Sequence, residues 1–310
     1  MKVERKPAGS RWRDVHGILL FDKPSGPSSN RALQQVRRIY RAAKAGHTGS
    51  LDPLASGLLP ICFGEATKIA GLLLGSDKAY EAECRLGETT STDDIEGEVL
   101  AERPVPSLSA DAIRIELAAL TGAIVQVPPA YSAIKRAGVP LYRRARRGES
   151  VSAPPRQVEV RRFDLLESDA DTLRLRIECG PGTYVRSLVR DLGERLGCGA
   201  HLTALRRLWA EPFRGHAMVG IDQLNQLAEA GEAVLDGLLL PIEAAFGTYP
   251  QIRLEQRAAD RLAHGQPVQI DAEWPVGRCA ALDIDGRTVA LCECDEHGLL
   301  RVLRGFRRTG

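Results

Sequence analysis

Residues 46–68 read GHTGSLDPLASGLLPICFGEATK, and the interpretation of the whole chain depends on them. Glycines and prolines interrupt positions 46–64 so often that we expect an irregular loop there, without regular secondary structure. Loops this long in a compact domain are usually either functional or disordered, and the apolar run LLPICF argues against disorder. We therefore expect a functional loop.

Asp52 is the residue of chemical interest in this loop. Because Pro53 follows it, the Asp52 backbone is restricted to extended conformations, and the glycines at 46 and 49 permit the close approach of a ligand. A carboxylate held in this way can act as a nucleophile. The alternative is a turn aspartate that accepts hydrogen bonds from its own backbone.

Regular elements are predicted before the loop. Residues 17–22, GILLFD, form an apolar strand that ends at the turn KPSGP. A helix follows, and its N-cap candidates are Ser28, Ser29 and Asn30. One face of this helix is expected to be positive, because no acid between positions 24 and 51 neutralises its basic residues, which are Arg37, Arg41 and Lys44.

The chain beyond the loop alternates between strand and helix patterns. Strands are predicted over 78–87, 158–167 and 172–179. Helices are predicted over 65–75, 109–122 and 221–231. Short strands at 278–285, 287–294 and 299–308, with a hairpin turn at Asp285–Gly286, indicate a separate small β domain that begins near residue 250.

Composition limits the functional classes. The 310 residues, 44% of them hydrophobic, suffice for about two domains. Lys and Arg total 42 against 40 Asp and Glu, so the net charge of +2 excludes a polycation, and any nucleic-acid surface must be a local patch. The most basic segment, 126–148, contains no acid and interleaves Tyr131 and Tyr142, as expected of an arm on an anionic partner. Its cations are Lys135, Arg136, Arg143, Arg144, Arg146 and Arg147.

Several other classes are excluded or disfavoured. None of the seven cysteines forms a C-x-x-C pair, so no structural metal site is expected, and Cys292 and Cys294 fit a strand better. The apolar run 54–64 is too short to cross a membrane. The N-terminus lacks a secretory apolar region, which favours the cytoplasm. P-loop, serine-hydrolase, zinc-protease and dinucleotide-binding motifs are all missing.

Residues 46–68 closely resemble the active-site motif of the TruB family of tRNA pseudouridine synthases. Four other segments agree with that family in order and spacing: GILLFDKPSG at 17–26, KAYEAECRLGETTSTDD at 78–94, GTYVRSLVRDLG at 182–193 and AHLTALRRL at 200–208. One departure is Ser91, which follows Thr90 where many members have aspartate. No role is therefore assigned to an acid at position 91.

The resemblance implies an α+β architecture. A catalytic domain of the pseudouridine synthase type would span 10–248, with a mixed, mainly antiparallel sheet, flanking helices and a basic thumb-like insertion at about 126–152. Residues 249–310 would form a small β domain, similar to the PUA type, that binds RNA.

The resemblance also implies a site. Asp52 would be the catalytic nucleophile, Arg186 would pair with it, and Tyr80 would stack on the target uracil. Further roles follow for substrate binding: Tyr184 and Leu205 would line the uracil pocket, His47 would support the flipped nucleotide, and Lys23 and Asp94 would hold supporting positions. No metal or other cofactor is implied.

The implied activity is the isomerisation of uridine to pseudouridine at position 55 in the T-loop of tRNA, after base flipping. The expected partner is the T stem-loop of tRNA, without a guide RNA or a membrane, and the expected state is a monomer. A secondary tRNA-folding activity is also implied. Whether the carboxylate first acts on the sugar or on the base stays open.

Two alternatives come from other functional classes. The basic segments are also compatible with an RNA-binding or RNA-folding protein whose chemistry is secondary. Asp52 could instead form an acid pair with Asp93 or Asp94, as in glycoside hydrolases.

Overall fold

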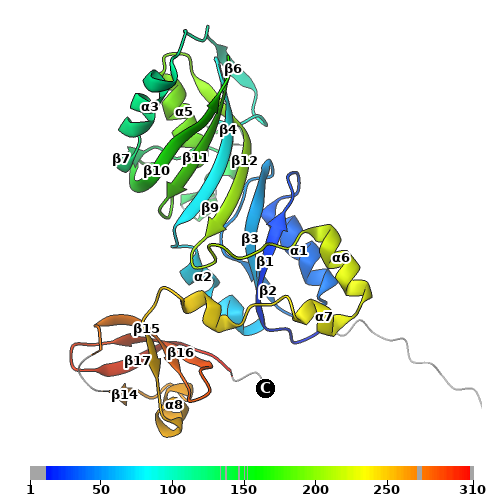
Figure 1. Ribbon diagram of the computed structural model, residues 1–310, viewed down its shortest axis with the longest axis vertical. Coiled ribbons are helices and arrows are strands. Elements are labelled where there is room, and N and C mark those ends of the chain that lie inside the picture. The colour runs from blue at the N-terminus through cyan, green and yellow to red at the C-terminus, as the bar shows by residue number, and fades with distance from the viewer. Residues whose placement is uncertain are drawn as a thin grey trace, which may run out of the picture.

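Two β-sheets form the framework of the protein (Figure 1). The computed structural model describes residues 12–132, 134–136, 138–145, 147–149, 151, 153–270 and 274–307. An eight-stranded sheet is formed by the first two thirds of the chain, and a five-stranded sheet by the C-terminal part. Within the described ranges, no helix is long and apolar enough to cross a membrane.

The large sheet has the strand order β1-β3-β12-β4-β11-β10-β7, and β2 pairs with β3. Its strands are β1 (Gly17–Lys23), β2 (Ala45–His47), β3 (Ala55–Phe63), β4 (Lys78–Leu86), β7 (Gly122–Gln126), β10 (Arg156–Ser168), β11 (Thr172–Cys179) and β12 (Ala200–Ala210). Only β3 and β12 run parallel, and the other pairs are antiparallel. The expected mixed, mainly antiparallel sheet is confirmed, as are the strands predicted at 17–22, 78–87, 158–167 and 172–179.

The expectation of an irregular loop over 46–64 was wrong for 46–47, which belong to β2, and for 55–63, which form β3, whereas residues 48–54 do form a loop without helix or strand. Pro60 is tolerated in β3 because it lies where the neighbour of β3 changes from β12, which contacts Ala55–Gly57, to β2, which contacts Ile61–Phe63. On this side of β3, its missing N–H therefore interrupts no continuous ladder, and on the other side Pro60 keeps its place opposite Leu20 of β1. Gly57 has a φ of 96°, and a Cβ there would overlap the backbone of Arg207. Only glycine permits β12 to approach this closely.

Helices cover the sheet in two groups (Figure 1). The helices α1 (Ser29–Ile39), α6 (Ile221–Glu229) and α7 (Glu232–Asp236) pack near β1, while α3 (Ala110–Ala119) and α5 (Val185–Arg195) pack on β10 and β12. The helices predicted at 109–122 and 221–231 are confirmed. The segment after β3 is helical as predicted and consists of η1 (Gly64–Ile69) and α2 (Ala70–Leu73).

The predicted positive face of the first helix was wrong. Ser28 caps α1 by accepting from the Arg31 N–H, but the helix ends at Ile39, and Arg41 has a φ of 50°. Arg41 and Lys44 therefore lie beyond the helix. Glu232 of α7, which is distant in sequence, contacts the Arg41 guanidinium at 3.2 Å.

The small sheet has the order β13-β15-β16-β17-β14. Its strands are β13 (Gln251–Arg253), β14 (Val268–Gln269), β15 (Gly277–Leu282), β16 (Thr288–Cys294) and β17 (Leu299–Gly305). The predicted C-terminal strands, including Cys292 and Cys294 in one strand, are confirmed, whereas the helix α8 (Gln256–Ala263) was not anticipated. Side chains of η1 join it to this unit: the Lys68 ammonium group donates to the Gly305 carbonyl at 2.9 Å, and Glu65 accepts from the Arg307 N–H at 2.8 Å.

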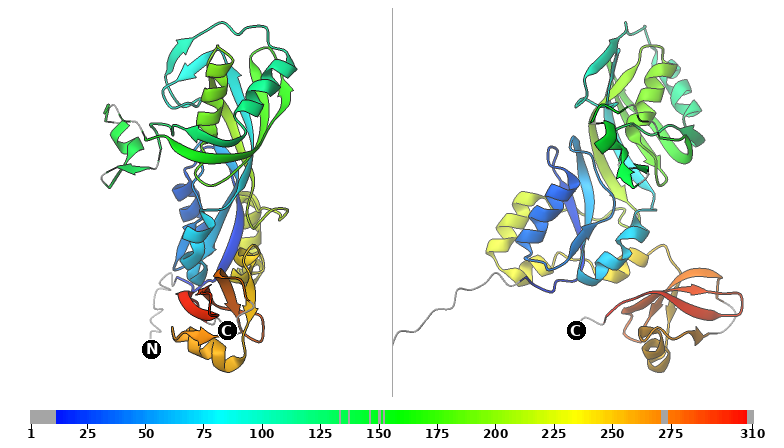
Figure 2. Two further views of the ribbon diagram at one scale, coloured as in Figure 1. Left: turned by 90° about the vertical axis from the view of Figure 1, so that its left-hand side faces the viewer. Right: turned by 180° about the vertical axis from the view of Figure 1, so that it is seen from behind.

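The insertion between β7 and β10 projects away from the body of the protein (Figure 2). We call residues 126–152 the thumb; it contains β8 (Lys135–Arg136), β9 (Val139–Pro140) and α4 (Leu141–Ala145). Arg143 and Arg147 are exposed, and Arg144 donates to Glu149 at 2.6 Å. Arg146 and the side chains of Lys135 and Arg136 lie outside the described part of the structure. Elsewhere in the chain, a separate hairpin consists of two strands, β5 (Glu88–Thr90) and β6 (Val99–Glu102).

Candidate active site

A cavity of about 360 Å³ lies between the loop 48–54, the face of the large sheet and the start of α5. Its volume is in the range of roughly 300–1,000 Å³ that is usual for ligand pockets. Its lining includes five of the predicted site residues, which are Asp52, Tyr80, Tyr184, Arg186 and Leu205. A larger cavity of about 560 Å³ lies between the two sheets and contains none of the predicted site residues. The smaller cavity is therefore the candidate site.

Asp52 and Arg186 form an ion pair in this cavity. Arg186 Nε lies 3.0 Å from Asp52 Oδ2, with the arginine side chain 5% exposed and the aspartate side chain 40% exposed. Burial raises the pKa of Asp52, and the attraction of Arg186 opposes that rise. The guanidinium thus favours the anionic carboxylate and fixes its direction.

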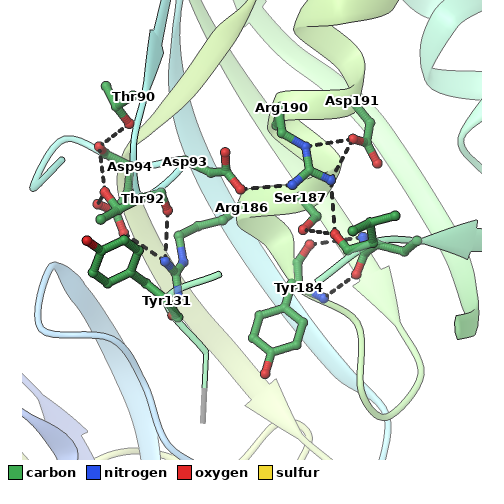
Figure 3. Close-up of polar contacts among 12 residues, drawn as sticks. Thr90, Thr92, Asp93, Asp94, Tyr131, Tyr184, Arg186, Ser187, Arg190 and Asp191 are labelled. Carbon is green, nitrogen blue, oxygen red and sulfur yellow. Dashed lines mark hydrogen bonds and ion pairs between the residues drawn. The ribbon is translucent and has the colours of Figure 1, made fainter. Parts of the chain in front are cut away.

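The Arg186 guanidinium is held on its other side by two loops (Figure 3). Nη1 donates to the Thr92 carbonyl at 2.8 Å and lies 3.3 Å from Asp94 Oδ2, while Nη2 donates to the Tyr131 carbonyl at 3.0 Å. The Thr92 hydroxyl also donates to Asp94. Asp94 is buried and does not line the cavity, so it supports Arg186 rather than facing a ligand.

Asp93 points toward a different arginine. Its carboxylate lies 3.0 Å from Arg190 Nη1 (Figure 3). Burial raises the pKa of Asp93, and Arg190 opposes that rise. Neither Asp93 nor Asp94 lines the cavity, so neither faces Asp52 as the second acid of a hydrolytic pair.

Aromatic and apolar side chains form the walls of the cavity. Tyr80 projects from β4, and burial raises the pKa of its phenol to about 12, so the phenol is protonated at neutral pH. The Tyr184 ring lies 4.9 Å from the guanidinium carbon of Arg156, in a cation–π contact. Leu205 of β12 is buried. Flat surfaces of this kind suit a planar ligand such as a nucleobase.

Lys23 and His47 lie around the cavity rather than in its lining. Lys23 is fully buried and donates to the carbonyls of Ala55 at 2.7 Å and Pro24 at 2.9 Å. Burial lowers the pKa of Lys23 to about 8, against the opposing attraction of Asp52. His47 is half-buried in β2, and burial lowers its pKa. Among the described residues, its Nδ1 atom has no hydrogen-bond partner.

Three cations of the lining were not anticipated: Lys78, Arg156 and Arg207. Burial lowers the pKa of Lys78 to about 8. Lys78 and Arg207 each lie two positions along a strand from a predicted residue, Tyr80 or Leu205, so the strand period of two could have indicated them. No local signal distinguishes Arg156.

A cavity with these walls and a paired carboxylate suits an enzyme that acts on a flipped base, and comparison with known proteins identifies the class as pseudouridylate synthase. Residues 37–185 match the family model described as "TruB family pseudouridylate synthase (N terminal domain)". Residues 186–247 match "tRNA pseudouridylate synthase B C-terminal domain". The chain belongs to the TruB family, which confirms the resemblance seen in the sequence.

Curated relatives agree over nearly the full length. The tRNA pseudouridine synthase B of Xanthomonas axonopodis pv. citri is 55% identical over 295 residues, which are 95% of each chain. That of Stutzerimonas stutzeri is 47% identical over 296 residues, 95% of this chain and 97% of the relative.

The solved structures that resemble this fold include Cbf5 complexes. The archaeal box H/ACA sRNP Nop10–Cbf5 complex matches with a TM-score of 0.72 and 25% identity, over 95% of this chain and 87% of that chain. A Cbf5–Nop10–Gar1 complex matches with a TM-score of 0.74 and 25% identity, over 94% and 84% of the two chains.

Proposed function

We propose that this chain is an isomerase that converts uridine to pseudouridine at position 55 in the T-loop of tRNA. The observation that carries the proposal is the Asp52–Arg186 pair, 3.0 Å apart in a cavity walled by Tyr80 and Tyr184. Membership of the TruB family and the names of its relatives support tRNA as the substrate.

The reaction balances without a second reactant. The bond between C1′ and N1 of uracil breaks, the base rotates, and a bond between C1′ and C5 forms. C5 loses a proton, and N1 gains one, so the product is an isomer of the substrate. The enzyme must therefore hold a detached base and control a reactive sugar, which a carboxylate can do by forming a bond or by removing a proton.

The cavity supplies the parts that this reaction requires. Asp52 acts as the anion, and the attraction of Arg186 opposes the rise in its pKa that burial causes. The uridine must leave its stack, at a cost of a few kcal/mol. Stacking on Tyr80 returns about 1 to 3 kcal/mol of that cost. Tyr184 and Leu205 close the walls around the base, and Lys23 supports the loop that carries Asp52 by donating to the Pro53 carbonyl at 3.4 Å. His47 would support the flipped nucleotide.

The binding surface lies outside the cavity. We assign the phosphate contacts to the thumb, through its exposed Arg143 and Arg147, and to the basic strand β17, through Arg301 and Arg304. Residues 10–248 would be the catalytic domain, and residues 249–310 a PUA-like RNA-binding domain. The protein would act as a cytoplasmic monomer without a guide RNA, and assistance to tRNA folding would use the same surface.

Replacement of Asp52 by asparagine tests the proposal. Incubation with a T stem-loop transcript, without ATP and with a chelator present, should give pseudouridine with the unchanged protein and none with Asp52→Asn. Affinity for the transcript should stay within about tenfold, because the basic surfaces supply most of the binding. Asp111→Asn, at an exposed position on α3, is the matched control. Turnover by Asp52→Asn, or release of free uracil by the unchanged protein, would contradict the proposed reaction.

A further inference from the structure

The root of the thumb is bonded directly to the start of α5. Gln126, at the end of β7, is fully buried. Its Oε1 accepts from the Tyr184 N–H at 2.8 Å, and its Nε2 donates to the Tyr184 carbonyl at 3.1 Å. One amide side chain thus satisfies both backbone groups of a single residue from a distant part of the chain.

Tyr184 lies where α5 begins, next to the cavity. Tyr184 is the N-cap of α5, and its own side chain makes no capping hydrogen bond. Its ring instead lines the cavity, and Arg186 follows in the first turn of the helix. The unsatisfied N–H groups of the first turn therefore receive no bond from the side chain of the N-cap residue. Gln126 does not bond those groups, but it holds the backbone of the residue from which the helix starts.

Further bonds connect the same two segments (Figure 3). The Val127 carbonyl accepts from the Ser187 hydroxyl at 2.9 Å and from Arg190 Nη2 at 3.0 Å. The Tyr131 carbonyl accepts from Arg186 Nη2 at 3.0 Å. Every one of these contacts joins residues 126–131 to the first turns of α5.

We propose that Gln126 is a positioning residue for the isomerisation, which fixes the Tyr184 backbone and thereby aims the Tyr184 ring into the cavity and Arg186 at Asp52. The inference rests on the proposed function. Gln126 does not touch the base. Because the thumb continues from this residue, the same bonds tie the RNA-binding arm to the catalytic pair.

Two variants remove different parts of this restraint. Gln126→Leu keeps most of the buried volume but leaves the Tyr184 N–H without its partner and the Tyr184 carbonyl with the Leu188 N–H alone, at 3.2 Å. Gln126→Glu keeps the acceptor for the N–H and loses the donor to the carbonyl. Gln157→Leu is the matched control, because Gln157 is an exposed glutamine on the adjacent strand β10.

The measurement is the single-turnover rate of pseudouridine formation at saturating T stem-loop, together with the affinity for that RNA. Gln126→Leu should lower the rate about 10- to 100-fold, since displacements near 1 Å in a catalytic site have effects of this size. Gln126→Glu should give a smaller loss. Affinity should change less than about threefold in both variants, because no phosphate contact is removed.

The pH profile separates positioning from a general loss of structure. The charged groups that influence the pKa of the Asp52 carboxylate are Arg186 from α5, Asp94 from the loop after β5, which acts from behind Arg186, and Lys23 from β1. A loosened Arg186 lowers the pKa of Asp52 less, so the acid limb of the rate profile should move to higher pH in Gln126→Leu. A merely destabilised protein would keep the limb in place.

An unchanged rate, a loss confined to affinity, or an unmoved acid limb would overturn the inference. Thermal unfolding of each variant accompanies the assays, and if Gln126→Leu is unfolded at the assay temperature, the rate and pH profile of Gln126→Glu decide. Absence of pseudouridine with the unchanged protein and with Gln157→Leu would instead reject the proposed function itself.

Discussion

Arg207 of β12 lies directly opposite Tyr80 of β4, and its guanidinium donates to the carbonyl of Gly49 in the loop that carries Asp52. The distance to that carbonyl is 3.1 Å, and Arg207 Nε donates to the Leu58 carbonyl of β3 at 2.6 Å. A buried arginine therefore connects the catalytic loop with two strands. Within the described ranges, no carboxylate forms an ion pair with it.

Arg207→Met should destabilise the protein by about 3 kcal/mol, because two carbonyls lose a charged donor in a buried place. It should also lower the rate of pseudouridine formation, since the loop of Asp52 loses its anchor. The adjacent Arg206→Met is the control. Arg206 pairs with Asp22 at a partly exposed site, so its loss should cost less than about 1 kcal/mol. Urea denaturation measures both values, and equal effects would contradict the anchoring role.

Gly57→Ala should prevent β12 from seating against β3. The positive φ and the overlap of a Cβ with the Arg207 backbone act together, so we expect a loss of about 3 kcal/mol or more. In Gly46→Ala, by contrast, the added Cβ meets no atom within 4 Å, and the change should be nearly neutral. The measurement is a comparison of the unfolding midpoints of the two variants. A stable Gly57→Ala protein would refute the explanation given for the close approach of β12 to β3.

Stability should fall as the pH rises above about 9. Burial raises the pKa of five cysteines from an ordinary 9.0 to about 12 for Cys62, Cys84 and Cys292 and to about 11 for Cys179 and Cys279. Above pH 9 these thiols stay protonated in the folded chain but ionise in the unfolded one. Their contribution to the free energy of unfolding is therefore complete below pH 9 and is lost as the pH rises toward 11 to 12.

Lys23 and Lys78 act in the opposite direction, because burial lowers their pKa from 10.5 to about 8. Their contribution to the free energy of unfolding therefore increases as the pH rises from about 8 to 10.5. The cysteines outnumber these lysines, and the free energy of unfolding should therefore decrease between pH 9 and 11. Urea titrations across this range, with a reductant present, provide the measurement. Cys292→Ala should flatten the decline, and a rising curve in the unchanged protein would rule out this balance.

The double change of Arg143 and Arg147 to alanine should weaken tRNA binding. Each phosphate contact to a single strand contributes about 0.7 to the slope of log affinity against log salt, so removal of two contacts should make that slope shallower by about 1.4. The exposed Arg114→Ala on α3 should leave it unchanged. If the slope is the same in all three proteins, these two thumb arginines do not contact the RNA backbone.

The sequence predicted those strands and helix ends that are determined by residues close together in the chain. β1, β4, β10 and β11 follow from apolar alternation, and the N-cap of α1 follows from Ser28. β3 could not be predicted in the same way, because Gly57 and Pro60 are ordinary strand breakers. What makes them acceptable is the position of β12 and β2 beside β3, which only the folded chain reveals.

The same distinction holds for the site. Asp52, Tyr80 and Arg186 could be proposed because they lie in segments that resemble the motifs of the family. The structure brings their side chains to one cavity. Gln126 could not be proposed, since its partner Tyr184 is far away in sequence and a lone glutamine at the end of a strand carries no signal. Residues that act by holding others are the hardest to see in a sequence.

The insertion of β12 between β3 and β4 also has a consequence for biosynthesis. Translation delivers β3 and the Asp52 loop early, whereas the strand that must separate β3 from β4 is synthesised much later. Nascent chains therefore carry two unfinished sheet edges while the ribosome completes α5 and β12, and such edges are prone to aggregation. The cavity that holds the catalytic pair would be complete only after β12, which supplies Leu205 and Arg207 to its lining, has paired with β3 and β4.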